Sequence, residues 1–369
     1  MRKCLVTGAG GFLGKHLVLS LEQAGIPVLP YHHGDGETAL AFCCRECSFV
    51  FHLAGVNRPE QPEEYETGNA GFTRKLVETL GETGNACPIV FASSIQAERD
   101  NPYGRSKQAA ERILLEHGEK TGASVCIYRL PNVFGKWCRP NYNSVVATFC
   151  HNQANGLPLT VNDASYGLNL AYVDDVMEEF LNLLDEETKV ESAYREIPVM
   201  YRETVGEIAS LVRSFEDCRR NLRIPDQKDG FARKLYSTYL SYLPSDALSY
   251  PLEMHEDARG SFTEFMRTGD RGQFSVNISR PHVVKGNHWH HTKHEKFLVV
   301  SGEGVIRLRR VGEQDVVAYR VSGKKLEVVE IPPGYTHNIE NIGEREMVTL
   351  MWANESFDPE RPDTWRMEV

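Results

Sequence analysis

A tyrosine and a lysine four positions apart, Tyr103 and Lys107, are suited to acid–base chemistry. On a helix this spacing places both side chains on one face. The lysine ammonium then favours the phenolate, which makes the tyrosine a usable acid near neutral pH. Ser94 precedes Tyr103 by nine residues and ends an apolar run, where a hydroxyl can hold a carbonyl oxygen. These residues predict proton donation to a carbonyl substrate.

A second group combines three histidines with one glutamate. His288 and His290 alternate, which places both on one face of a strand. We expect Glu295 on the next strand and His337 on a later one, so that all four side chains converge inside a barrel. Three imidazoles and one carboxylate suit zinc, iron, manganese or nickel rather than calcium. The pattern predicts a divalent metal site, for which we favour zinc.

A glycine-rich segment follows the first apolar run. Thr7 is followed by Gly8, Gly11 and Gly14 in the pattern T-G-x-x-G-x-x-G. The first glycine permits a tight turn, the second lets the backbone approach a pyrophosphate, and the third allows a helix to pack closely on a strand. Because the anion would then lie at the N-terminus of the next helix, the segment predicts a bound dinucleotide.

The second expected strand bears on the choice between NAD and NADP. An acid at the end of this strand would bind the ribose 2′-hydroxyl of NAD. The run that begins at Val28 contains no acid before Asp35, and His32 and His33 could face a 2′-phosphate instead. We therefore expect NADPH as the cofactor.

Two regions with different hydrophobic patterns carry these groups. Residues 1 to about 235 alternate short apolar runs with helical periodicity, which indicates a Rossmann-like α/β domain with a parallel sheet. From about residue 260, short alternating segments are separated by glycine turns, which is typical of an all-β sandwich or barrel. We predict an α/β domain over 1–243, a linker over 244–254 and an all-β domain over 255–369.

The amino-acid composition indicates which classes of binding partner are favoured and which are disfavoured. The 369 residues include 41 Lys and Arg against 51 Asp and Glu, a net charge of −10, which disfavours binding to nucleic acids or anionic membranes. No apolar run is long enough to span a membrane. The nine cysteines follow no disulfide framework, which favours reduced thiols and the cytoplasm. We expect a small-molecule substrate, and the chain length and β-rich domain favour a homodimer.

The first 180 residues or so resemble the extended short-chain dehydrogenase/reductases. Besides the glycine segment and the Tyr/Lys pair, the resemblance rests on HLAG at 52–55, RLPNVFG at 129–135 and YVDD at 172–175. It implies a nucleotide-sugar substrate and a catalytic triad of Ser94, Tyr103 and Lys107. Ser48 replaces the acid that often contacts adenine in this family. We expect the cofactor-binding residues to be Gly8, Gly11, Phe12, Leu13, Gly14, His32, Leu53, Ala54, Tyr103 and Lys107.

Residues 255–369 resemble the cupin family, whose two signature motifs match H-x-H-x4-E-x6-G from His288 and P-x-G-x2-H-x3-N from Pro332. The glycines that normally precede these motifs are missing. The segments 257–264 and 285–288 are also similar to deoxysugar 3,5-epimerases, themselves cupins, in which the corresponding histidine is the catalytic base. His288 therefore has two interpretations, metal ligand or base.

The two parts together resemble the bacterial capsular polysaccharide bifunctional epimerase/reductases over essentially the whole chain. The resemblance implies that the cupin epimerises C3 of a UDP-2-acetamido-2,6-dideoxy-4-keto-hexose and that the reductase reduces the 4-ketone with NADPH. The product would be UDP-2-acetamido-2,6-dideoxy-L-talose, on the route to UDP-N-acetyl-L-fucosamine for capsule or O-antigen.

Chemistry beside a ketone explains why the two sites belong together. The ketone acidifies neighbouring C–H bonds, so a base in the barrel such as His288 can invert C3 or C5 through an enolate. A metal or Lys296 would stabilise the enolate charge. Two alternatives remain open. The cupin could be a structural or dimerisation module beside a reductase, or it could be a metal-dependent dioxygenase.

Overall fold

The computed structural model describes residues 2–185, 193–226, 228–269 and 272–369. These residues form two compact units. The first comprises residues up to Val212 together with Lys234–Leu243, and the second comprises Arg213–Arg233 together with Pro244–Val369. None of the described helices is long and apolar enough to cross a membrane.

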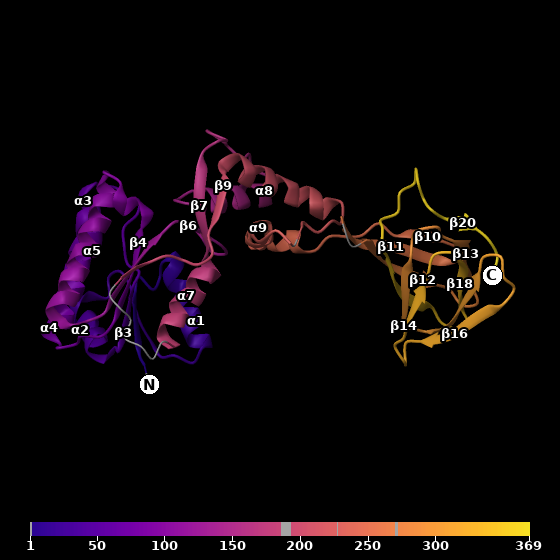
Figure 1. Ribbon diagram of the computed structural model, residues 1–369, viewed down its shortest axis with the longest axis horizontal. Helices are drawn as coiled ribbons and strands as arrows, with labels where there is room; N and C mark the ends of the chain where they lie inside the picture. The colour runs from indigo at the N-terminus through magenta and orange to yellow at the C-terminus, as the bar shows by residue number, and fades with distance from the viewer. Residues whose placement is uncertain (1, 186–192, 227, 270–271) are drawn as a thin grey trace. The chain divides into compact units, whose positions relative to one another are not determined.

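The first unit contains a parallel sheet flanked by helices (Figure 1). The sheet has six strands in the order β2-β1-β3-β4-β5-β8. Every residue of β1 and β3 is buried. A strand that is covered on both faces needs apolar residues at successive positions, which is why short continuous apolar runs mark this sheet in the sequence. The strands are β1 (Cys4–Thr7), β2 (Val28–Tyr31), β3 (Phe49–His52), β4 (Ile89–Ser94), β5 (Val125–Leu130) and β8 (Ala193–Arg195).

Helices cover both faces of this sheet, so successive strand residues enter different cores. Val6 packs with Leu17 of α1 and Phe180 of α7, whereas its neighbour Leu5 packs with Leu76 of α4 and with α5. The expected Rossmann-like class is confirmed. The helices are α1 (Phe12–Gln23), α2 (Gly36–Glu46), α4 (Phe72–Glu82), α5 (Pro102–Thr121) and α7 (Val173–Asp185).

The remaining helices and strands up to Leu240 are short or lie outside the six-stranded sheet. A three-stranded sheet has the order β6-β7-β9. These elements are α3 (Glu63–Tyr65), β6 (Asn132–Phe134), α6 (Val145–Ala154), β7 (Gly167–Tyr172), β9 (Tyr201–Thr204), α8 (Val205–Arg220) and α9 (Gly230–Leu240).

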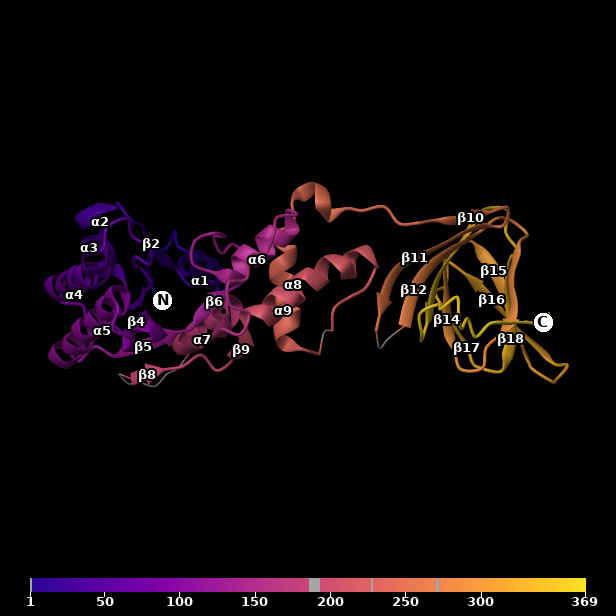
Figure 2. The ribbon, with the colours of Figure 1, turned by 90° about the horizontal axis from the view of Figure 1, so that it is seen from above.

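The second unit contains two antiparallel sheets, with orders β10-β11-β12-β19-β14-β17 and β16-β15-β18-β13-β20 (Figure 2). The expected all-β class is confirmed. The strands are β10 (His255–Asp257), β11 (Gly260–Thr268), β12 (Gly272–Ser279), β13 (Val284–Trp289), β14 (Glu295–Ser301), β15 (Glu303–Arg310), β16 (Val316–Ser322), β17 (Val328–Ile331), β18 (Tyr335–Asn341), β19 (Met347–Ala353) and β20 (Trp365–Arg366).

The interior of the second unit is partly polar. Phe297, Ile306 and Ile339 belong to its apolar core. On β12, however, the buried side chains are polar, and the alternating apolar ones are less buried. The interior therefore provides hydrogen-bonding groups as well as apolar packing. The buried polar side chains of β12 are Gln273, Ser275, Asn277 and Ser279.

Candidate functional site

The glycine-rich segment forms the turn between β1 and α1. Gly8 has a φ of +68°, in the left-handed region, and a Cβ at this position would lie 2.8 Å from the backbone of Ala54. Gly11 is the N-cap residue of α1. The first N–H groups of a helix have no partner within the helix, so this end of α1 can bind a pyrophosphate.

His52 connects the glycine turn to the neighbouring strand and helix. Its Nδ1 lies 2.8 Å from the Thr7 hydroxyl, and its Nε2 lies 2.9 Å from the Thr73 hydroxyl. Burial, reinforced by the charge of Lys107, lowers the pKa of His52 to about 3, so the ring is neutral. The Thr7 hydroxyl also accepts a hydrogen bond from the Ala54 N–H at 3.2 Å. In the sequence, His52 stands out only as part of the HLAG motif, and nothing there indicates these two contacts.

His32 directly follows β2 and lies against the glycine turn. A Cβ at Gly10 would be 3.3 Å from the His32 Nδ1. The His32 N–H donates a hydrogen bond to the Asp35 carboxylate at 2.6 Å. The structure therefore places an imidazole beside the turn, whereas Asp35, the next acid in the sequence, binds the backbone of His32.

Helix α5 carries the Tyr/Lys pair and begins at Pro102, after a capping asparagine. The Asn101 side chain accepts a hydrogen bond from the Gly104 N–H at 2.8 Å, and Pro102 occupies the first helical position. Tyr103 lies in the first turn, and Ser94 ends β4. Burial raises the pKa of Tyr103, and the interaction with the Ser94 hydroxyl opposes this effect. The structure thus brings Ser94 and Tyr103 together.

Lys107 is buried one turn further along α5. Its Nζ donates a hydrogen bond to the Ala92 carbonyl at 2.7 Å and lies 4.5 Å from the centre of the Phe91 ring. Burial lowers the pKa of Lys107 to about 8, and the negative charge of Glu111 opposes this effect. A lysine in this environment exchanges its proton near neutral pH.

Glu111 lies one turn after Lys107, and sequence analysis missed it. It is 1% exposed, and its carboxylate accepts hydrogen bonds from the Ser93 hydroxyl and from two guanidinium nitrogens of Arg129 at 2.7 and 3.0 Å. The carboxylate therefore joins α5 to the ends of β4 and β5, next to Ser94. The spacing of four residues from Lys107 was the available sequence signal.

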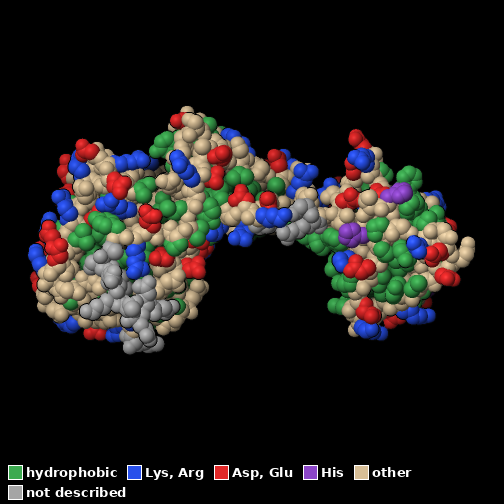
Figure 3. Space-filling model, in the orientation of Figure 1, with side chains coloured by type: hydrophobic (Ala, Val, Ile, Leu, Met, Phe, Trp, Pro, Cys, Tyr) green, Lys and Arg blue, Asp and Glu red, His purple; other side chains and the backbone are tan. Residues whose placement is uncertain are grey.

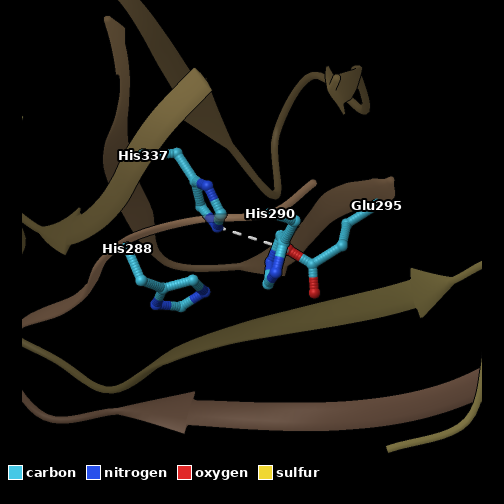
Figure 4. Close-up of side chains that lie close together, drawn as sticks. All are labelled: His288, His290, Glu295 and His337. Atoms are coloured by element: carbon cyan, nitrogen blue, oxygen red, sulfur yellow. Dashed lines mark ion pairs between the residues drawn. The ribbon is translucent and has the colours of Figure 1, made fainter. Parts of the chain in front are cut away.

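The histidines and the glutamate form one cluster in the second unit (Figure 4). His288 lies on β13, Glu295 begins β14 and His337 lies on β18, while His290 immediately follows β13. One ligand atom from each side chain lies within 4.8 Å of the others. The Glu295 Oε2 is 3.2 Å from the His337 Nε2 and 3.5 Å from the His290 Nε2.

The cluster has the burial and charge that a metal site requires. Within the described residues, the Nε2 atoms of His290 and His337 and the Oε2 of Glu295 are buried without a hydrogen-bond partner. Burial, reinforced by His337, lowers the pKa of His288 to about 4. Burial raises the pKa of Glu295, but the nearby imidazoles of His290 and His337 outweigh this effect and keep the carboxyl ionised. An anion and imidazoles with unpaired nitrogens fit a divalent cation.

Lys296 does not join the cluster. Side chains alternate along β14, so Glu295 faces the histidines and Lys296 faces the other side of the sheet. The Lys296 side chain is 45% exposed and forms an ion pair with Glu330. Our expectation that Lys296 contributes to the same site therefore lacks support in the geometry.

Two family models match the chain. The model of the NAD dependent epimerase/dehydratase family matches residues 4–195, and that of the polysaccharide biosynthesis C-terminal domain matches residues 255–365. The first match covers the parallel sheet with its glycine turn and Tyr/Lys pair. The second covers both antiparallel sheets and the histidine cluster.

Individual proteins match all or part of the chain. UDP-2-acetamido-2,6-beta-L-arabino-hexul-4-ose reductase of Pseudomonas aeruginosa is 46% identical over 100% of this chain and 99% of its own length. A crystal structure of the capsular polysaccharide assembling protein CapF from Staphylococcus aureus is 49% identical in sequence and has a TM-score of 0.93. The match covers 99% of this chain and 100% of the CapF chain. A crystal structure of Bacillus cereus UDP-glucuronic acid 4-epimerase, 19% identical with a TM-score of 0.53, covers 58% of this chain and 84% of that one, and shares the fold of the first unit. The chain is therefore an enzyme of the NAD dependent epimerase/dehydratase family and uses a nicotinamide cofactor.

Proposed function

We propose that this enzyme acts on a UDP-2-acetamido-2,6-dideoxy-4-keto-hexose in two steps. Residues 255–369, a cupin, epimerise C3 of the sugar, and residues 1–243 reduce the 4-ketone with NADPH, while 244–254 form the linker. The product is UDP-2-acetamido-2,6-dideoxy-L-talose, on the route to UDP-N-acetyl-L-fucosamine. The observation that carries the proposal is the match over the whole chain to a protein whose name specifies reduction of a UDP-linked hexul-4-ose.

Ser94, Tyr103 and Lys107 are the groups we assign to the reduction. Bound NADPH would supply the hydride for C4 of the sugar. The Ser94 hydroxyl holds the ketone oxygen, and Tyr103 donates its phenolic proton to that oxygen as negative charge develops there. The ammonium of Lys107 favours the resulting phenolate. The buried Glu111 keeps Lys107 charged to a higher pH than burial alone would allow.

The cupin must remove the proton at C3 and return it to the other face. His288 is the candidate base, since its lowered pKa of about 4 leaves the ring neutral and able to accept a proton. The same neutrality suits a ligand, so the roles of base and ligand both remain for His288. His288, His290, Glu295 and His337 would hold a divalent metal, for which we favour zinc, and its charge would stabilise the enolate oxygen. We assign no role to Lys296.

The choice of NADPH is supported by His32. Its imidazole lies at the glycine turn, where NAD-binding proteins of this fold place an acid after the second strand. Asp35 is held by the backbone of His32 and so does not point freely toward a ribose.

An exposed apolar row supports a homodimer. The strand registers place Val276, Leu350, Leu298 and Val328 side by side on the outer face of four neighbouring strands. Leu350 is 38% and Val328 is 55% exposed, and Figure 3 shows hydrophobic side chains gathered over this unit. Contiguous apolar surface of this kind marks protein interfaces. The free state of the nine cysteines fits the proposed cytoplasmic location.

The decisive experiment is an NMR time course in deuterated buffer with the UDP-4-keto sugar. Without NADPH, the protein should exchange the C3 proton for deuterium, and adding NADPH should convert the epimer to the 4-hydroxy product. His337→Ala should lose bound metal and stop the exchange, yet still reduce a substrate that is supplied already epimerised. His291→Ala is the matched control, because this neighbouring histidine is exposed and lies outside the cluster.

Other outcomes separate the alternatives. Exchange that persists in metal-free protein would give the metal a structural role and leave His288 as the base. Exchange that never occurs in wild-type protein would leave a reductase with a structural or dimerisation cupin. Oxygen consumption by iron-loaded protein would indicate a dioxygenase.

A further inference from the structure

The C-terminal segment packs along the strands that carry the histidines. In β20, Arg366 pairs with His288 of β13. The Met367 N–H donates a hydrogen bond to the Asn287 carbonyl at 2.9 Å, and the Thr336 hydroxyl donates one to the Met367 carbonyl at 2.5 Å. The segment is thereby fixed to β13 and β18 at the same time.

Asp363 precedes β20 and binds the loop between β13 and β14. Its carboxylate accepts hydrogen bonds at 2.9 Å from the N–H groups of His291, Thr292 and Lys293, and another at 3.1 Å from the Thr292 hydroxyl. Three successive amides that converge on one carboxylate form a cradle for an anion. Burial raises the pKa of Asp363, but these amides outweigh it and hold the pKa well below its usual range.

The backbone of the same residue contacts a member of the histidine cluster. The carbonyl oxygen of Asp363 lies 2.5 Å from the Nδ1 of His290. A carbonyl only accepts, so Nδ1 must carry the hydrogen. In the neutral ring the lone pair is then on Nε2, which faces Glu295 at 3.5 Å and has no hydrogen-bond partner among the described residues (Figure 4).

The backbone of Asp363 adopts a conformation that needs support. Its φ is +43°, in the left-handed region, which non-glycine residues seldom adopt, although aspartate and asparagine adopt it more often than most. Strained conformations persist where their surroundings hold them in place. Here the three amide contacts of the carboxylate hold the residue so that its carbonyl points at His290.

We propose that Asp363 is a positioning residue for the metal site, and this rests on the metal-binding function proposed above. Its carboxylate fixes the loop that follows His290, and its carbonyl fixes the tautomer and orientation of the His290 ring. Asp363 lies 73 residues from His290 in the sequence and does not itself belong to the cluster. Partners of this kind typically change metal affinity 10–100-fold when they are mutated.

The test uses the full-length protein after metal removal, with zinc affinity measured by competition against a chromogenic chelator. Asp363→Asn keeps the shape and tolerates the left-handed backbone, but its amide cannot replace the charge, so we expect zinc to bind about 10–100-fold more weakly. Asp358→Asn is the matched control, because among the described residues the side chain of this exposed acid accepts a hydrogen bond from the Glu360 N–H alone. It should leave zinc affinity unchanged. Cofactor binding should stay the same in both variants, which shows that the first unit is intact.

A second measurement does not depend on any variant folding. In metal-free wild-type protein with ¹⁵N-labelled histidine, at a pH above the titration of the His290 ring measured in the same experiment, the neutral ring should carry its hydrogen on Nδ1. A hydrogen on Nε2, or Asp363→Asn protein with wild-type zinc affinity, would overturn the proposal. A wild-type protein that does not bind zinc would instead refute the metal site itself, and the tautomer would still decide whether Asp363 orients His290.

Discussion

Gly14→Ala tests whether the glycine turn is as closely packed as its sequence requires. A Cβ at Gly14, in α1, would lie 2.1 Å from the Gly8 carbonyl oxygen and 2.8 Å from the Ala9 Cα. Both are backbone atoms of the turn that we expect to hold the pyrophosphate. A side chain could rotate away, but here the turn itself must move. The methyl group should therefore reduce both stability and cofactor binding.

The size of the effect follows from two opposing contributions. Overpacking typically costs about 1–3 kcal/mol, and contact at 2.1 Å places this site at the upper end. Alanine gains up to about 1 kcal/mol over glycine within a helix, so the net loss is roughly 2 kcal/mol. Gly81 of α4 is the matched control, because a Cβ there would meet nothing within 4 Å and only the gain applies. Replacing glycine by alanine should therefore lower the stability at Gly14 and maintain or raise it at Gly81.

Urea unfolding and calorimetric titration with NADPH measure the two consequences. The Gly14→Ala protein should unfold at lower urea and bind NADPH more weakly, because the turn that we expect to hold the pyrophosphate must move. The Gly81→Ala protein should bind NADPH normally and unfold at the same or higher urea. If Gly14→Ala matched the wild type in both measurements, the close approach of α1 to the turn would be wrong.

Three further predictions concern the reductase. Tyr103→Phe should keep NADPH binding but lose ketone-dependent NADPH oxidation, whereas Lys107→Ala should impair both. General acid catalysis contributes about 100-fold or more, so a Tyr103→Phe turnover above a tenth of wild type would contradict the assignment. Since the pKa of Lys107 is about 8, the rate should fall as the pH rises through that value. Glu111→Gln should move this decrease in rate to lower pH, whereas Glu98→Gln, which removes the other acid paired with Arg129, should not. Identical pH–rate profiles for Glu111→Gln and wild-type protein would rule out the role of Glu111. NADPH should bind more tightly than NADH by calorimetry, and equal affinities would refute the choice based on His32.

Local patterns were sufficient to predict the fold class of both units. A buried parallel strand needs apolar residues at every position, and β1 and β3 supply them as short continuous runs. The glycine spacing marked the turn after β1 because few other residues could adopt the φ of Gly8 or pack at Gly14. The Tyr103/Lys107 spacing likewise placed both residues on α5. In each case the signal and the structure lie within one turn or one strand.

For residues that act through distant contacts, no sequence pattern indicated which partners they would meet. Glu111 joins Ser93 and Arg129, each 18 residues away in sequence, and its carboxylate could equally have been a solvent-exposed charge on α5. Asp363 contacts a loop about seventy residues earlier, in a segment without periodicity. Only the folded chain shows that these carboxylates are held by several donors at once.

The barrel shows why alternation alone cannot decide which side chains face inward. Glu295 and Lys296 are adjacent, and a pairing shifted by one residue would exchange their faces. On β13 the alternation itself is interrupted, because Lys285 pairs with Ile339 and Gly286 with Asn338, but His288 pairs with His337. Asn287 is therefore the extra residue of a β-bulge, and its φ is +59°. Without that bulge, Asn287 rather than His288 would lie opposite His337, so a backbone irregularity that the sequence does not announce directs His288 into the cluster.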